Sequence, residues 1–154
     1  IAKIEACRAY GATVIEGGVA LADAMEAAKR RAADAGMVFC HPYDDPAVVA
    51  GQATLGLELL EDIADLRRVV VPIGGGGLAA GVAIAVKQHD PTIEVIGVQA
   101  DACAPYASLP TSAGAVVTLA DGIAVKHPGE ITRPLIAPPR RAGICNSAFD
   151  TPST

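Results

Sequence analysis

Four consecutive glycines give this sequence its clearest candidate for chemistry. They occupy positions 74–77, after an apolar run at 69–73 and before another at 78–86. Glycine lets the backbone come close to a ligand and adopt positive φ, so that successive N–H groups can point at one anion. A helix that starts at the last of these glycines would add the positive end of its dipole. The pattern therefore predicts a site for a phosphate group.

The spacing around the glycines leaves three interpretations open. The P-loop pattern is absent, because no Lys-Ser or Lys-Thr pair follows the glycines. The dinucleotide pattern G-x-G-x-x-A is met twice, starting at Gly74 and at Gly75, and Asp101 lies near the place of a ribose-binding acid. A tight turn for close helix–sheet packing would need only one or two glycines. We favour a ligand with a single phosphate over a dinucleotide or a simple turn.

A few other residues could do chemistry, but their surroundings favour structural roles. Asp45 precedes Pro46 and can cap a helix, and we expect Asp44 to be solvated. His41 stands in the same loop and is more typical of a loop residue than of a base. We expect Cys40, at the end of a predicted strand, to lie in the core.

The cysteines and histidines do not form a metal-binding pattern. The four cysteines are far apart, no CxxC pair occurs, and the three histidines do not complete the spacing of a ligand set. Isolated thiols of this kind are typical of a reduced, cytoplasmic protein. We expect Lys87, at the end of the helix that follows the glycines, to be solvated. No catalytic residue and no metal site are therefore predicted among these side chains.

Alternating periodicities predict the elements that must position the glycines. The helix that follows Asp45 and Pro46 is the best marked, and the glycine loop lies between a strand and a helix that is apolar nearly all round. We expect helices at 3–10, 19–34, 46–62 and 77–88, strands at 12–15, 37–40, 69–73 and 94–99, and a short strand or loop at 118–125. Strands that alternate with helices are typical of an α/β fold with a parallel sheet, and we expect the strand at 69–73 to be covered on both faces.

Charge and composition exclude some classes of partner and suggest an incomplete chain. The 154 residues carry a net charge of −5 without a basic stripe, so we expect no nucleic-acid partner. No apolar run reaches the length of a membrane span, so we expect no membrane partner. The sequence starts at Ile1 without an initiator methionine, which we interpret as the start of a fragment. We expect residues 137–154, rich in proline and without periodicity, to be an unstructured tail unrelated to the rest.

The glycine motif and its flanks together resemble one enzyme family. The sequence around the glycines resembles the tetraglycine phosphate loop of fold-type II pyridoxal-phosphate enzymes, and the threonine and serine dehydratases are the most similar group. The loop and the HPYDDP helix start are the most specific parts, and the resemblance covers about residues 1–136. Four segments carry it, namely KIEACRAYGATVIEGG, FCHPYDDPAVVAGQATLGLELLED, VVVPIGGGGLAAGVAIAVK and LADGIAVKHPGEIT.

The resemblance implies a cofactor, a reaction and a set of binding residues. The cofactor would be pyridoxal 5′-phosphate, and the reaction would convert L-threonine or L-serine to a 2-oxo acid and ammonia. The parent enzyme would be a homo-oligomer of the α/β class. The backbone of five residues would hold the cofactor phosphate, and Gly122 would lie near the cofactor ring by its backbone. Those five residues are Gly74, Gly75, Gly76, Gly77 and Leu78.

Departures from the family pattern limit what this chain is expected to do alone. The family's Schiff-base lysine lies in an SFKxRGA-type motif, and neither that motif nor the AGNHAQG-type segment occurs here. Gln99 stands where metal-binding relatives carry glutamate, so the resemblance gives no support for a metal site. We therefore expect a fragment that is inactive alone. A non-catalytic α/β domain for a phosphate ligand or a dinucleotide, and a remnant without function, stay open as alternatives.

Overall fold

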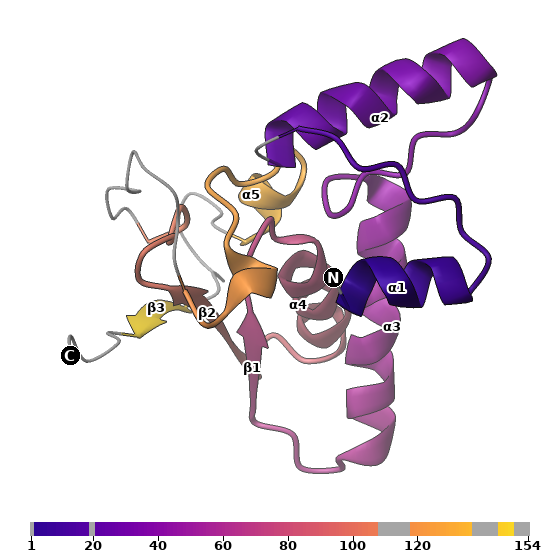
Figure 1. Ribbon diagram of the computed structural model, residues 1–154. Coiled ribbons are helices and arrows are strands. Elements are labelled where there is room, and N and C mark those ends of the chain that lie inside the picture. The colour runs from indigo at the N-terminus through magenta and orange to yellow at the C-terminus, as the bar shows by residue number, and fades with distance from the viewer. Residues whose placement is uncertain (1, 19–20, 108–117, 137–144, 150–154) are drawn as a thin grey trace. The chain divides into compact units, whose positions relative to one another are not determined.

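The computed structural model describes residues 2–18, 21–107, 118–136 and 145–149. The chain divides into two compact units, Ile1–Cys40 and His41–Thr154, and each is described by itself. Figure 1 shows the elements of both units. Within the described ranges, no helix combines the length and the apolar character that crossing a membrane requires.

The first unit contains two helices and two extended segments. Helix α1 (Ala2–Ala9) ends before Gly11, and α2 (Leu21–Ala35) ends before Gly36; both glycines have positive φ, as the sequence predicted for helix ends. The strands predicted at 12–15 and 37–40 are wrong, because neither segment joins a ladder in the described part of the unit. An isolated extended segment has no neighbour to pair its backbone groups, and Val38 is 94% exposed.

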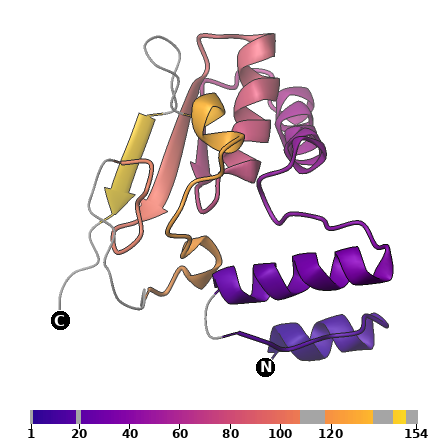
Figure 2. The same ribbon diagram turned by 90° about the horizontal axis from the view of Figure 1, so that it is seen from above.

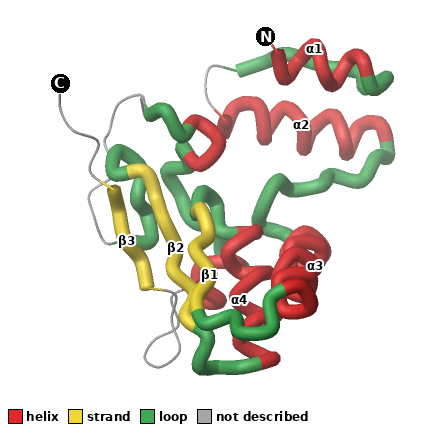
Figure 3. Tube along the Cα trace, turned by 90° about the horizontal axis from the view of Figure 1, so that it is seen from below, coloured by secondary structure: helices red, strands yellow, loops and turns green. Residues whose placement is uncertain are grey.

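The second unit is built on a parallel sheet with the order β1-β2-β3. The strands are β1 (Arg68–Pro72), β2 (Glu94–Ala100) and β3 (Cys145–Phe149). Val69 pairs with Val95, and Ile96 pairs with Cys145. Figures 2 and 3 show the strands side by side, with α4 (Gly77–His89) next to the sheet and α3 (Pro46–Asp62) beyond α4. The α/β class with a parallel sheet is confirmed.

Two predictions about this sheet need correction. We expected β1 to be covered on both faces, but burial alternates along it and Val70 is 60% exposed, so only the face toward α4 is covered among the described residues. We expected an unstructured tail at 137–154, but residues 145–149 form β3 because they pair with the open edge of β2. The other residues of that range lie outside the described ones.

Helices α3 and α4 pack closely because glycines face the partner backbone. A β-carbon at Gly81 would lie 2.6 Å from the backbone nitrogen of Ala53, and one at Gly56 would lie 2.8 Å from Cβ of Ala85. Helix α3 begins as predicted, because the Asp45 carboxylate accepts the N–H of Ala47 at 2.7 Å. Helix α4 is buried nearly all round, and its buried apolar residues join β1 and β2 in the core.

The remaining elements are short and lie beyond β2. A 3-10 turn, η1 (Asp121–Ile123), stands where the sequence allowed a strand or a loop, and α5 (Thr132–Ile136) follows. Ile136 and Thr132 are fully buried, and Ile136 belongs to the same core as α4. These segments therefore lie at the same part of the fold as the start of α4.

Candidate functional site

The glycine loop connects the carboxyl end of β1 to the start of α4. Ile73 donates its N–H to the carbonyl of Val98 at 2.7 Å, so strand pairing continues up to the first glycine. Gly76 is the N-cap of α4 and has φ +101° and ψ −7°, which is the left-handed region. Ligands of open α/β sheets bind at this end of the strands. The predicted loop is thus confirmed in position and conformation.

Tyr43 explains two of the four glycines by close packing. A β-carbon at Gly75 would overlap the ring of Tyr43. A β-carbon at Gly77 would lie 2.8 Å from the carbonyl oxygen of Tyr43. Both contacts are shorter than real side chains make, and the backbone of Tyr43 has little freedom to move away. The loop preceding α3 therefore packs directly on the backbone of the glycine loop.

The other two glycines face different neighbours. A β-carbon at Gly74 would lie 3.1 Å from Cα of Ile123, in η1. At Gly76 it would overlap the Tyr106 hydroxyl and lie 2.9 Å from Thr132 Oγ1, in addition to the strain of positive φ. We expected one or two glycines to suffice for packing. The structure instead gives each of the four a packing reason, which does not compete with a role in binding.

The loop also presents a group of backbone donors without helical partners. The first helical hydrogen bond of α4 runs from Ala80 N–H to the carbonyl of Gly76 at 2.8 Å. The N–H groups of Gly77, Leu78 and Ala79 therefore have no acceptor four residues earlier. Within the described residues, the N–H of Gly75 donates to no recorded acceptor. No acidic side chain stands in the first turn of α4. These donors and the helix dipole fit the phosphate of a cofactor.

Three donors hold the carbonyl of Gly75 on the side away from those N–H groups. The Tyr106 hydroxyl lies 2.9 Å from this oxygen, and the Thr132 hydroxyl lies 2.7 Å from it. The N–H of Gly129 is a third donor at 3.3 Å. Burial raises the pKa of Tyr106 above its usual value of 10.0, so this hydroxyl keeps its proton at neutral pH.

Asp44 fixes the start of α5 and is not the solvated residue that we expected. Its carboxylate accepts the N–H groups of Glu130 at 2.9 Å, Ile131 at 2.9 Å and Thr132 at 3.2 Å. His41 Nδ1 accepts the N–H of Asp44 at 2.8 Å, which leaves His41 in the role of a loop residue, as predicted. Asp44 thus acts as a cap for a helix that begins 88 residues later in the chain.

Sequence reasoning missed the side chains that surround the loop. Tyr106 and Gly75 are 31 residues apart, and Thr132 and Gly75 are 57 apart. A tyrosine and a threonine have no spacing pattern that marks such contacts. The nearest signal was the HPYDDP segment, which the resemblance marked as specific and which supplies Tyr43 and Asp44.

The other predicted residues are placed as follows. Gly122 lies in η1, and a β-carbon there would meet nothing within 4 Å, whereas its neighbour Ile123 lies against the loop. Cys40 is exposed and does not belong to the core, which corrects that expectation. Lys87 is exposed at the end of α4, as predicted, and donates to the carbonyl of Pro91 at 3.0 Å. No cluster of three or more metal-ligating side chains occurs in the ranges that the structure covers.

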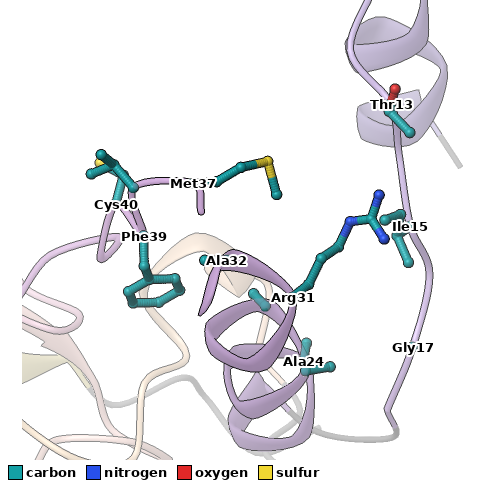
Figure 4. Close-up of a pocket in the computed structure, with 12 residues that line it drawn as sticks. Thr13, Ile15, Gly17, Ala24, Arg31, Ala32, Met37, Phe39 and Cys40 are labelled. Carbon is teal, nitrogen blue, oxygen red and sulfur yellow. The ribbon is translucent and has the colours of Figure 1, made fainter. Parts of the chain in front are cut away.

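The first unit contains a cavity of about 430 Å³ that has little chemistry of its own. Its lining comes from α2 and from the extended segments before and after it, and Arg31 is the only charged residue in that lining. Figure 4 shows Arg31 reaching toward Ile15, with Met37, Phe39 and Cys40 on another side. A binding site normally places several polar groups to fix its ligand. We therefore regard the glycine loop as the candidate site.

Comparison with known protein families gives one broad match. A family model described as "Pyridoxal-phosphate dependent enzyme" matches residues 1–144 of this chain, which is past residue 136, where we expected the resemblance to stop.

Several curated relatives are similar over most of this chain. An L-threonine ammonia-lyase of Thermotoga maritima is 48% identical over 141 residues, which is 88% of this chain and 35% of that protein. One of Geobacter sulfurreducens is 46% identical over 140 residues, with 87% and 35% covered. The catabolic L-threonine dehydratase of Escherichia coli is 42% identical over 139 residues, with 87% and 42% covered. The chain therefore spans only 35 to 42% of the length of these relatives.

Solved structures give a consistent result. A maize serine racemase superposes with a TM-score of 0.86 at 28% identity, covering 97% of this chain and 48% of the racemase. A threonine deaminase from the organism abbreviated T.th. superposes with a TM-score of 0.80 at 37% identity, covering 94% of this chain and 50% of the deaminase.

Proposed function

Because this chain belongs to the pyridoxal-phosphate-dependent enzyme family, we propose that it supplies the phosphate-binding part of a threonine or serine dehydratase. The observation that carries the proposal is the set of free backbone donors at the start of α4, next to the left-handed Gly76. Phosphate groups are commonly bound in this way, by N–H groups at a helix N-terminus. The similarity to the L-threonine ammonia-lyases supports the choice of enzyme.

The proposed binding residues are those that the sequence marked. Gly74, Gly75, Gly76, Gly77 and Leu78 would hold the cofactor phosphate by their backbone, and no side chain of the loop competes for the same space. Packing of Ile123 against Gly74 supports a place for Gly122 beside the site. When bound, pyridoxal phosphate supplies an electron-withdrawing ring that stabilises negative charge on the substrate.

We propose that the 154-residue chain has no dehydratase activity by itself. It contains the loop but not the lysine motif with which the family binds the cofactor covalently. L-threonine or L-serine would be the substrate of the parent enzyme. Residues 1–136 would form the dehydratase part, and the character of residues 137–154, the homo-oligomer and the cytoplasmic location stay predictions. Addition of L-threonine and pyridoxal phosphate to the purified chain should release no 2-oxobutanoate.

Binding of aldehyde-free cofactor analogues tests the loop. Pyridoxine 5′-phosphate and pyridoxine differ in the phosphate alone, and neither can react with lysine side chains. We expect the phosphate ester to bind more tightly and to shift the amide resonances of residues 74–78 in ¹⁵N-labelled protein. The Gly76→Ala variant should lose that preference, because Gly76 needs positive φ.

Two outcomes would contradict this proposal. Equal binding of pyridoxine and its phosphate would show that the loop holds no phosphate of this cofactor. Tighter binding of NAD than of pyridoxine 5′-phosphate would favour the dinucleotide interpretation, although Asp101, its predicted ribose-binding acid, is exposed after β2.

A further inference from the structure

The buried hydroxyls behind the glycine loop form a connected group. Tyr106 Oη and Thr132 Oγ1 each lie within hydrogen-bond distance of the Gly75 carbonyl oxygen, at 2.9 and 2.7 Å, and lie 3.0 Å from each other. Thr132 is fully buried and Tyr106 is 8% exposed. Solvent therefore does not compete strongly for these contacts, and their geometry is set by the protein.

Counting protons shows that the Gly75 carbonyl always receives a donor from this pair. Each hydroxyl has one hydrogen and can accept as well. Two hydrogens serve three contacts, so in any arrangement that avoids facing lone pairs one hydroxyl donates to the other. The second hydroxyl then donates to Gly75. Its carbonyl is bonded in either case, and the N–H of Gly129 adds a further donor at 3.3 Å.

Holding this carbonyl also orients the next N–H group. The peptide between Gly75 and Gly76 is trans, so the Gly76 N–H points opposite to the Gly75 carbonyl. The hydroxyls of Tyr106 and Thr132 therefore direct that N–H away from themselves. Without them, a glycine peptide has unusual freedom to rotate, because glycine populates both signs of φ.

The two hydroxyl residues are themselves anchored from opposite sides. The side-chain oxygen of Gln99, which is 1% exposed, accepts the N–H of Tyr106 at 2.9 Å. The Asp44 carboxylate accepts the N–H of Thr132 at 3.2 Å and those of the two residues before it. The group thus connects β2, the loop before α3 and the start of α5 to one peptide of the glycine loop.

We propose that Tyr106 and Thr132 are positioning residues that preorganise the glycine loop for the cofactor phosphate. They act through the Gly75 carbonyl and do not touch the phosphate. A loop that already has its N–H groups oriented binds an anion without a further entropic cost of ordering. This inference rests on the proposed phosphate site, and it assigns to these two side chains a role that neither the glycine motif nor its spacing contains.

Removing one hydroxyl at a time tests the proposal. The Tyr106→Phe and Thr132→Val variants should each bind pyridoxine 5′-phosphate about 3- to 10-fold more weakly, as expected for one hydrogen bond, with the affinity for pyridoxine unchanged. Thr132→Ser should keep the wild-type preference because it keeps the hydroxyl. Tyr43→Phe is the matched control, because Tyr43 also packs on Gly75 but its hydroxyl makes no hydrogen bond recorded in the described residues. Equal preference for the phosphate ester in wild type, Tyr106→Phe and Thr132→Val would overturn the inference.

A ligand-free measurement separates this inference from the proposed function. The ¹³C carbonyl resonance of Gly75 reports hydrogen bonds to its oxygen. It should move in Tyr106→Phe and Thr132→Val and stay in place in Tyr43→Phe and Thr132→Ser. An unmoved resonance in Tyr106→Phe would refute the positioning role whatever the wild type binds. A moved resonance in a wild-type background that ignores phosphate would leave the contact standing, and would refute both the phosphate site and its preorganisation.

Discussion

The ring of Tyr43 occupies the space that a β-carbon at Gly75 would need. This contact joins the two segments of the sequence that were most specific in the family resemblance, the HPYDDP loop and the four glycines. The same tyrosine faces Gly77 by its backbone, with its carbonyl oxygen 2.8 Å from a β-carbon placed there. The glycines are therefore required by a neighbouring loop as well as by the shape of the turn, and the two motifs form one packed unit.

We predict that Gly75→Ala lowers the free energy of unfolding by about 1 to 3 kcal/mol, because a methyl group must displace the Tyr43 ring. Gly122→Ala is the control, since a β-carbon there meets nothing within 4 Å, and it should leave stability nearly unchanged. Urea denaturation of both variants measures the difference. Adding Tyr43→Ala to Gly75→Ala should reduce the extra loss. Equal midpoints and slopes for the two single variants would show that the ring yields without cost.

We predict opposite effects for two glycines of the α3–α4 pair. Gly81→Ala should destabilise the protein, because its β-carbon would lie 2.6 Å from the backbone nitrogen of Ala53. Gly51→Ala in α3 should stabilise it by about 0.5 to 1 kcal/mol, because the added methyl group meets nothing and alanine favours the helix. Thermal unfolding measures both. The close packing of these helices would be in doubt if Gly81→Ala raised the melting temperature as Gly51→Ala should.

Local signals predicted the elements that depend on local physics. Asp45 and Pro46 marked the start of α3, because a cap and a fixed φ act within a few residues. The apolar run before the glycines marked β1, and the glycines marked its end. The segments at 12–15 and 37–40 have the same local character but form no strand, because a strand also needs a neighbour, which no local pattern supplies.

The candidate site divides in the same way. The glycine loop could be predicted because four adjacent residues carry the signal. Tyr106 and Thr132 could not, because they reach Gly75 across 31 and 57 residues and act through hydroxyls that are common in any sequence. Asp44 was misread as solvated for the same reason, since its three donors lie more than 80 residues later in the chain.

We predict that Asp44→Ala destabilises the protein more than Asp45→Ala does. Loss of Asp44 leaves three N–H groups without an acceptor and should cost at least about 2 kcal/mol. Loss of the Asp45 cap removes one bond and should cost about 0.5 to 2 kcal/mol. Hydrogen exchange should accelerate at Glu130, Ile131 and Thr132 in Asp44→Ala and not in Asp45→Ala. Unchanged protection of these amides in Asp44→Ala would contradict the role of its carboxylate.

We predict that Thr92→Val raises the pKa of Asp90. The Thr92 hydroxyl, and next its N–H, donate to the Asp90 carboxylate at 2.7 and 2.8 Å and hold the pKa of Asp90 below its ordinary value of 3.8. A lowered pKa stabilises the fold above the unfolded value and loses that contribution as the pH falls through the folded pKa. A ¹³C titration of the Asp90 carboxyl below pH 5 follows the change. Thr92→Ser should keep the pKa low, and an identical titration in Thr92→Val would exclude the hydroxyl as the main cause.

We predict that Tyr106 contributes to the loss of stability at alkaline pH. Burial is the largest cause that raises the pKa of Tyr106, and the hydrogen bonds from its surroundings only partly oppose it. Because the folded pKa lies above the unfolded value of about 10, the contribution of the neutral hydroxyl is complete below pH 10 and is lost as the pH rises further. Tyr106→Phe removes this titration, so its free energy of unfolding should fall less steeply above pH 10 than that of the wild type. Some slope should remain, because burial raises the pKa of Tyr43 as well. Tyr10→Phe, at a tyrosine that is 91% exposed, is the control and should follow the wild-type curve. Urea denaturation between pH 8 and 11 measures all three proteins, and a Tyr106→Phe curve parallel to the wild type would show that the buried hydroxyl does not couple folding to pH.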